Sequence, residues 1–213
     1  MIEVIKNEYL KYLLNGQKNE CLKIVNNLLD QGIDIKQLYT NLLQYSLYEV
    51  GKLWEYNKIS VAKEHLATSI TEFIMNTIYP RIFLAEHTGK KAIVACLPNE
   101  FHQVGAKMVA DIFELNAWDG YFLGSNVPTN DLIKMIQDIN PDLVGISMSI
   151  YFNISELVYI VNEINSQFPN QKIVVGGQGF NQGGKDFMST FPNVTYISDI
   201  YNLEKYIKKI GYD

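Results

Sequence analysis

The residues of this chain best suited to chemistry stand in the stretch NEFHQVG, residues 99–105, where a histidine follows a carboxylate and precedes a glycine. Glu100 can hold one ring nitrogen of His102, which fixes the tautomer and leaves the lone pair of the other nitrogen for a metal. Gly105 would let a bulky group approach the backbone. No other His, Cys or carboxylate stands at ligand spacing nearby, so a metal here would bring most of its own ligands, as in a macrocyclic cofactor. An ordinary surface histidine is the alternative that this residue alone leaves open.

The elements around this stretch predict a parallel sheet. An apolar run at 92–97 precedes it and an amphipathic segment at 103–115 follows it, and the same alternation then repeats. Strands too apolar to face water on either side, separated by helices, are typical of a Rossmann-like, doubly wound α/β sheet of five strands. Ligands bind outside the carboxyl ends of such strands, and His102 follows the first of them. The other predicted strands cover 121–123, 143–148, 173–175 and 194–197, and the other predicted helices cover 129–139, 153–167, 183–190 and 200–210.

The N-terminal part has a different hydrophobic pattern. From residue 3 to about 86 apolar residues recur with helical period, which predicts four amphipathic helices and hence an antiparallel four-helix bundle. The polar stretch 87–90 marks the predicted boundary, with a bundle domain at 1–87 and a sheet domain at 90–213, and His87 in this linker is expected to be solvated. The first two helices end at Asn15-Gly16 and Gln31-Gly32, and the last two cover about 35–55 and about 60–84.

Composition excludes several classes of function. The 213 residues are 47% hydrophobic, which is enough for packed cores. The net charge is −5 and the 18 Lys and Arg residues are scattered, so direct nucleic-acid binding is not expected. No apolar run approaches the roughly 18 residues of a membrane helix, so no membrane partner is expected. Without a signal-peptide pattern, Cys21 and Cys96 are expected to be reduced thiols of a soluble cytoplasmic protein.

The stretch around His102 also carries a family resemblance. Glu100, His102 and Gly105 resemble the D-x-H-x-x-G signature of cobalamin-binding domains, with Glu in place of Asp. The resemblance covers about residues 90–213. It implies a base-off, histidine-on mode, in which the benzimidazole of the cofactor swings away and His102 becomes the lower axial ligand of cobalt.

Two later motifs of that family follow in the expected order and spacing. Ser147 comes in the third predicted strand, and Gly176 and Gly177 come at the end of the fourth. By the resemblance, Ser147 would hydrogen-bond the displaced nucleotide tail, and the glycines would leave room for it beside the sheet. The strand motif of the family usually reads Ser-x-Leu, so Ser149 replaces the leucine in that wall of the binding slot.

A second resemblance concerns the bundle. Trp54, Val61, Glu64 and His65 resemble the cap of the light-sensing adenosylcobalamin photoreceptors, which repress carotenoid genes. In that group the Trp packs on the adenosyl group, the Glu contacts its ribose, and light breaks the cobalt–carbon bond so that the bundle moves. The residues alone leave open a plainer reading, a Trp plug beside a surface Glu-His pair.

Two departures from that group bear on function. Its repressors begin with a winged helix-turn-helix domain, which this sequence does not contain, so the output is expected to pass to a second copy of the chain or to a separate regulatory protein. The residue after the Trp is a histidine in the best-known members, where it takes the upper cobalt site once adenosyl has left. Here that residue is Glu55, so an oxygen of Glu55, the ring of His65 or water would take the site.

The sequence therefore favours a cobalamin-binding sensory module without catalytic activity that prefers adenosylcobalamin. The alternative is a corrinoid protein that carries a methyl group between methyltransferases and accepts methylcobalamin, although a bulky Trp54 suits its open upper face poorly. A cobalamin store or adaptor is the third reading. An adenosyl-dependent mutase is disfavoured because the chain cannot hold the substrate barrel of those enzymes.

Overall fold

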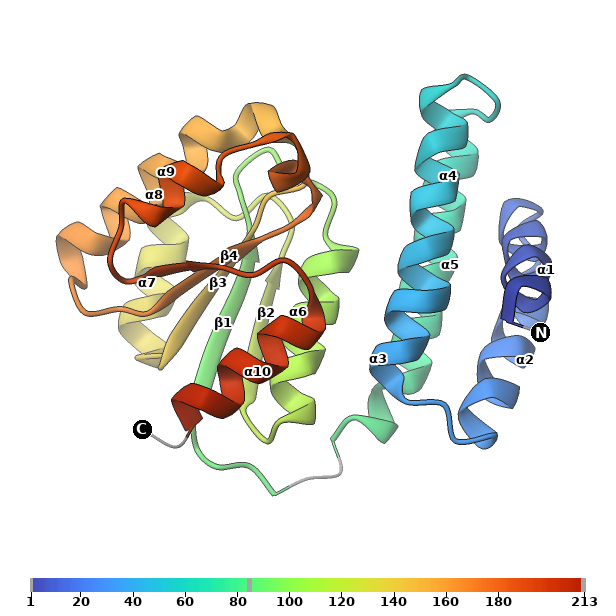
Figure 1. The fold of residues 1–213 in the computed structure, drawn as a ribbon, viewed down its shortest axis with the longest axis horizontal. Coiled ribbons are helices and arrows are strands. Elements are labelled where there is room, and N and C mark those ends of the chain that lie inside the picture. Colours follow the sequence, from blue (N-terminus) through green and yellow to red (C-terminus); the bar gives the residue numbers. More distant parts are fainter. Residues whose placement is uncertain (1, 84–85, 212–213) are drawn as a thin grey trace. The chain divides into compact units, whose positions relative to one another are not determined.

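The computed structural model describes residues 2–83 and 86–211, and the chain divides into two compact units, Met1–Arg81 and Ile82–Asp213. The first unit is helical and the second is built on a parallel sheet (Figure 1). This confirms the predicted fold class, a helical bundle followed by a Rossmann-like α/β domain. The division after Arg81 falls before the polar stretch 87–90, where the sequence placed the boundary. No helix in the described ranges is both long and apolar enough to cross a bilayer.

The helical unit buries one face of each helix in a common core. Tyr9, Leu13, Val25, Leu43 and Ile74 are fully inaccessible there. Burial of such side chains supplies most of the stability of short helices, which are marginal in isolation. The helices are α1 (Ile2–Leu14), α2 (Lys18–Asp30), the continuous run of α3 (Ile35–Leu38), η1 (Tyr39–Gln44) and α4 (Tyr45–Glu55), and α5 (Val61–Ile78) with the turn η2 (Tyr79–Arg81).

The third helix contains a π-helical segment, Tyr39–Gln44, which the sequence analysis did not predict. Its buried residues Leu38, Leu42, Ser46 and Val50 recur every fourth position. In an ideal α-helix each step of four residues turns the side chain by about 40° away from the previous one, so the series would leave the core. The i→i+5 bonds of a π segment widen the turn and keep these residues on the core side.

The fourth helix ends earlier than predicted. The sequence pattern predicted helix to about residue 84, whereas α5 ends at Ile78 and a 3-10 turn follows over Tyr79–Arg81. Pro80 explains the difference, because it has no backbone N–H to donate to the carbonyl four residues earlier. Residues 84 and 85 lie outside the described residues.

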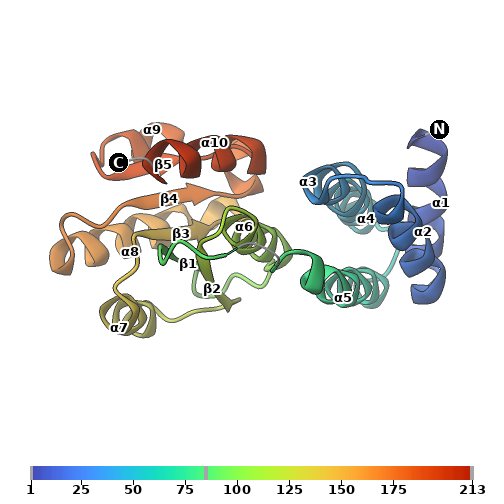
Figure 2. The ribbon, with the colours of Figure 1, turned by 90° about the horizontal axis from the view of Figure 1, so that it is seen from below.

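The sheet of the second unit has the strand order β2-β1-β3-β4-β5, and all of its pairs are parallel. The chain runs from β1 outward to β2 and then returns to place β3 on the other side of β1 (Figure 2). The carboxyl ends of β1 and β3 thus form the topological switch point, where open sheets of this kind bind ligands. The strands are β1 (Lys91–Cys96), β2 (Asp119–Gly124), β3 (Leu143–Ser147), β4 (Ile173–Gly176) and β5 (Val194–Tyr196).

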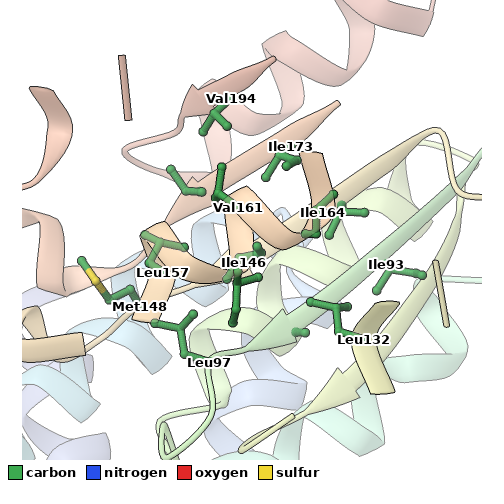
Figure 3. Packing of buried hydrophobic residues seen from close by; sticks show 14 of the residues in the cluster. Ile93, Leu97, Leu132, Ile146, Met148, Leu157, Val161, Ile164, Ile173 and Val194 are labelled. Carbon is green, nitrogen blue, oxygen red and sulfur yellow. The ribbon is translucent and has the colours of Figure 1, made fainter. Parts of the chain in front are cut away.

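Helices cover both faces of this sheet, as the apolar strands require. On β1, Ile93 and Ala95 join one hydrophobic cluster, whereas Ala92, Val94 and Cys96 join the other. The first cluster packs against α7 and α8 (Figure 3), and the second against α6 and α10. Alternate side chains point to opposite faces of a strand, so both faces are buried. The helices are α6 (Val104–Leu115), α7 (Thr129–Ile139), η3 (Tyr151–Asn153), α8 (Ile154–Gln167), η4 (Gln178–Gln182), α9 (Lys185–Ser189) and α10 (Ile200–Gly211).

His87 is exposed, as expected, but its ring is paired with two carboxylates of the second unit. Its Nδ1 lies 2.5 Å from Oδ1 of Asp119, at the start of β2. Its Nε2 lies 3.2 Å from Oε2 of Glu114, whose side chain is only 6% exposed. The hydrogen bond to Asp119 raises the pKa of His87 above its usual range, and the charge of Glu114 adds to this. The pairing attaches the segment before β1 to the amino end of the sheet.

Replacing His87 by Gln is expected to destabilise the protein in a pH-dependent way. A histidine whose pKa is raised on folding stabilises the fold fully below its unfolded pKa of about 6.5, and this contribution disappears as the pH rises through the folded pKa. Since the site is near the surface, the melting temperature should fall by about 1–3 °C at pH 6, and by less at pH 9. Thermal unfolding of both proteins at the two pH values tests this. An equal difference at both would contradict it.

Candidate functional site

The site is organised by a buried carboxylate. Glu100, in the loop between β1 and α6, is fully inaccessible to solvent. Its Oε1 accepts hydrogen bonds from the ring Nδ1 of His102 at 2.5 Å and from the backbone N–H of His102 at 3.2 Å. The His102 side chain is 53% exposed. The sequence prediction that Glu100 orients His102 is thus matched by the geometry.

The other oxygen of Glu100 reaches across the switch point to the loop after β3. Oε2 accepts from the backbone N–H groups of Ser149 and Ile150, both at 3.0 Å, and from Nδ2 of Asn153 at 3.4 Å. One carboxylate therefore connects the loop that carries His102 to the loop that follows β3. No local pattern in the sequence marks Ile150 or Asn153 as partners of Glu100, and Ser149 was predicted only to line the wall of a slot.

These hydrogen bonds determine the charge of the site. Burial by itself raises the pKa of the Glu100 carboxyl, but the hydrogen bonds from His102 and from the backbone of Ile150 outweigh it and lower the pKa below its usual value. Glu100 is therefore ionised at neutral pH and can only accept hydrogen bonds. It follows that Nδ1 of His102 carries the proton, and that a neutral ring presents its lone pair on Nε2, the nitrogen suited to ligating a metal.

Gly105 stands at the second position of α6, three residues after His102. A Cβ atom added there would meet no heavy atom of the described chain within 4 Å. Neither packing nor backbone conformation therefore requires a glycine at this position. This agrees with clearance for a bound group, which stays a prediction.

Ser147 and Gly176 are neighbours at the carboxyl edge of the sheet. They are the last residues of β3 and β4, and Ser147 pairs in register with Cys96 on one side and with Gly176 on the other. The structure therefore brings the predicted tail-binding positions to the same edge as His102. Their contact with a nucleotide tail remains a prediction.

The two glycines are also needed by the backbone itself. Gly177 has a φ of +110°, and a Cβ atom there would clash with the backbone carbonyl of Met148. A Cβ atom on Gly176 would lie 2.9 Å from the backbone oxygen of Ile197. Both glycines were predicted to provide clearance for a ligand, whereas the close approach of neighbouring backbone already explains why these residues are glycines.

The four predicted cap residues and Glu55 flank the turn between α4 and α5 (Figure 1). Trp54 and Glu55 end α4, and Val61 begins α5, whose N-cap is Ser60. Trp54 and Val61 are 48% and 51% exposed. Their proposed contact with an adenosyl group stays a prediction.

Glu64 and His65 form the expected pair on the first turn of α5. Oε2 of Glu64 lies 2.6 Å from Nδ1 of His65, and its Oε1 accepts from the hydroxyl of Thr68 at 3.0 Å. The carboxylate is thereby fixed in direction. Among the residues that the structure describes, no three His, Cys, Asp or Glu side chains converge on a possible ion site. A single imidazole is nevertheless sufficient for a metal held by a macrocycle.

Comparison with known proteins identifies the family. The B12 binding domain family matches residues 90–198, which is just over half of the chain. The chain belongs to this family of cobalamin-binding domains. A second B12 binding domain family, which matches residues 5–79, covers the helical unit. The residues present fit the cofactor, since His102 offers a half-exposed imidazole whose other nitrogen is held by a buried carboxylate.

Two relatives of this cobalamin-binding chain are transcriptional repressors of Myxococcus xanthus. The HTH-type transcriptional repressor CarH is 27% identical over 126 residues, which are 58% of this chain and 42% of CarH. The HTH-type transcriptional repressor CarA is 24% identical over 168 residues, which are 78% of this chain and 56% of CarA. The chain spans about half the length of these relatives or less.

Solved structures with the same fold include corrinoid proteins. The monomethylamine corrinoid protein of Methanosarcina barkeri matches with a TM-score of 0.84 and 13% identity, over 99% of this chain and all of that one. The methanol:cobalamin methyltransferase complex MtaBC from the same organism matches with a TM-score of 0.53 and 14% identity, over 95% of this chain and 77% of that one. At these identities the likeness shows the fold alone.

Proposed function

We propose that this chain is a sensory module that binds adenosylcobalamin base-off, with His102 as the lower axial ligand. The observation that carries the proposal is the buried, ionised Glu100, which holds Nδ1 of a half-exposed His102 at the switch point of the sheet. When bound, the cofactor would supply a light-sensitive cobalt–carbon bond. The chain itself orients the imidazole, and Ser147, Gly176 and Gly177 receive the displaced nucleotide tail.

The helical unit supplies the cap in this proposal. The exposed Trp54 and Val61 provide an apolar surface for the adenosyl group, and the fixed carboxylate of Glu64 accepts from a ribose hydroxyl. Loss of the adenosyl group removes these contacts and shifts the population of cap arrangements. The similarity to CarH and CarA, both transcriptional repressors, supports a regulatory role.

The output passes to a second copy of this chain or to a separate regulatory protein. A net charge of −5 without clustered Lys and Arg speaks against direct binding of nucleic acid. After the adenosyl group has left, Glu55, which is exposed beside Trp54, provides an oxygen, or water or His65 takes the upper position. The illuminated protein should then show a spectrum of one axial histidine with an oxygen or water ligand, and a spectrum of two axial histidines that persists in His65→Ala would contradict this.

A second candidate function is a carrier of methyl groups between methyltransferases. The likeness to the monomethylamine corrinoid protein over nearly the whole chain favours it. In such a carrier the upper face of the cofactor must be open to the partner enzymes. A bulky Trp54 beside the Glu64–His65 pair would cover that face, which argues against a methyl carrier. We therefore rank it second.

Reconstitution in the dark separates the two functions. The protein is loaded with adenosylcobalamin or methylcobalamin and then illuminated, and visible spectra and elution volume are compared before and after. A sensor is expected to bind adenosylcobalamin about tenfold more tightly, because Trp54 packs on the adenosyl group, and to change its elution volume on illumination. Equal affinity for both forms with no light-dependent change in elution would instead indicate the methyl carrier.

A further inference from the structure

Gly51 stands at a position where neither the packing nor the backbone conformation of the helical unit requires a glycine. It lies in the interior of α4, where glycine is the least favourable residue apart from proline. A Cβ atom added there would meet no heavy atom of the described chain within 4 Å, and its φ does not fall in the left-handed region. Alanine would therefore fit without strain and would favour the helix. The glycine reduces stability, and nothing inside the unit compensates for this.

The neighbours of Gly51 indicate what uses the space. Tyr48 and Trp54, three residues before and three residues after it, are each neighbours of Gly51 on the surface of α4, with 43% and 48% of their surfaces exposed. The hydroxyl of Tyr48 accepts a hydrogen bond from Nε2 of Gln44 at 3.1 Å, which restrains the ring. The glycine therefore leaves a strip of bare backbone between two exposed aromatic side chains. A flat aromatic ring could lie on this strip and contact both of them.

We infer that Gly51 determines the selectivity of the cap for the upper axial group, by admitting the purine of the adenosyl group against the backbone of α4. The inference rests on the proposed function, since it assigns this ring to the face that carries Trp54. A methyl group at residue 51 would hold a flat ring away from the helix and from Trp54. A small upper ligand such as hydroxide has no ring to place there and does not depend on the glycine.

The test is Gly51→Ala with a stability measurement beside the binding measurement. The variant is expected to melt about 2–3 °C higher than the wild type in the absence of cofactor, because alanine favours the helix. Its affinity for adenosylcobalamin should fall by about tenfold or more, and its affinity for hydroxocobalamin should stay within about twofold. A gain in stability together with a selective loss of binding is not expected from a purely structural glycine.

Ser69→Ala serves as the matched control, because Ser69 is an exposed position in the interior of α5. It should also favour its helix and leave both affinities unchanged. If Gly51→Ala binds adenosylcobalamin as the wild type does, or weakens both cobalamins equally, or melts lower, the inference is wrong.

Trp54→Ala separates failure of the inference from failure of the proposed function. If Trp54→Ala weakens binding of adenosylcobalamin and Gly51→Ala does not, the cap stands and only the role of Gly51 is lost. If neither variant changes the affinity, the adenosyl group does not lie on this face. The proposed cap then fails as well.

Discussion

The variant His102→Ala is expected to lose base-off binding of cobalamin. In the absence of the imidazole the benzimidazole of the cofactor keeps the lower cobalt site, and the visible spectrum should be that of the base-on form. The loss of affinity should exceed the roughly 10–100-fold that removal of an outer-shell partner costs at metal sites. Titration of the apoprotein with hydroxocobalamin, followed by visible spectroscopy, measures both effects.

The control for this experiment is His65→Ala, which removes an exposed histidine of the other unit. It should leave the base-off spectrum in place, because His65 serves only the proposed cap. A base-off, histidine-ligated spectrum that persists in His102→Ala would disprove the assignment of the lower ligand.

Glu100→Ala is expected to weaken both the fold and the site. The partly buried backbone N–H groups of Ser149 and Ile150 would lose their acceptor, at a cost toward the lower end of the roughly 1–3 kcal/mol of a fully buried unsatisfied group. The affinity for cobalamin should fall by about 10–100-fold, because His102 would no longer be held by its Nδ1. Chemical denaturation of the apoprotein and titration with hydroxocobalamin measure the two losses separately.

The pH dependence of this destabilisation follows from the direction of the pKa shift. The pKa of Glu100 is lowered on folding, so the ionised group stabilises the protein above its unfolded pKa of about 4.3. This contribution disappears as the pH falls through the folded pKa. The stability difference between the wild type and Glu100→Ala should therefore be largest near neutral pH and shrink in acid.

Two conservative variants show which property of Glu100 matters. Glu100→Gln preserves the shape but offers one acceptor oxygen where the carboxylate offers two. Glu100→Asp preserves the charge but is one methylene shorter, so it should serve either His102 or the loop after β3. Wild-type stability and affinity in Glu100→Asp would show that the length of the side chain is not needed to span both loops.

The sequence was sufficient to predict the fold, because buried parallel strands and amphipathic helices leave clear patterns. All five strands lie within a few residues of their predicted positions, and Ser147 and Gly176 meet in register as expected of strand ends. The pairing of Glu100 with His102 was also predictable, since the two residues are local in sequence. The local spacing of residues and the period of the hydrophobic pattern were therefore enough to predict most of the fold and the centre of the site.

What could not be predicted depends on contacts between distant segments. The bonds from Ser149 and Ile150 to Glu100 join residues about 50 positions apart, and backbone N–H groups carry no residue signature. The two carboxylates around His87 are likewise brought together only by the fold. The reasons for Gly176 and Gly177 lie in the backbone of neighbouring segments, which no motif records.

The π segment makes the third helix tolerant of a one-residue deletion at this place. Tyr39–Gln44 lies between the anchor residue Leu38 and the end of α4, where Trp54 is exposed. Each residue of a π segment turns the chain by less than the 100° of an α-helix, so the six residues of this segment cover about the rotation of five α-helical ones. Deleting one residue there would let the helix close into regular α turns and would leave Trp54 facing in its present direction relative to Leu38. The same deletion in the regular turns of α4 would instead turn Trp54 by about 100°, so the place of a deletion, and not only its length, decides whether the cap face keeps its direction.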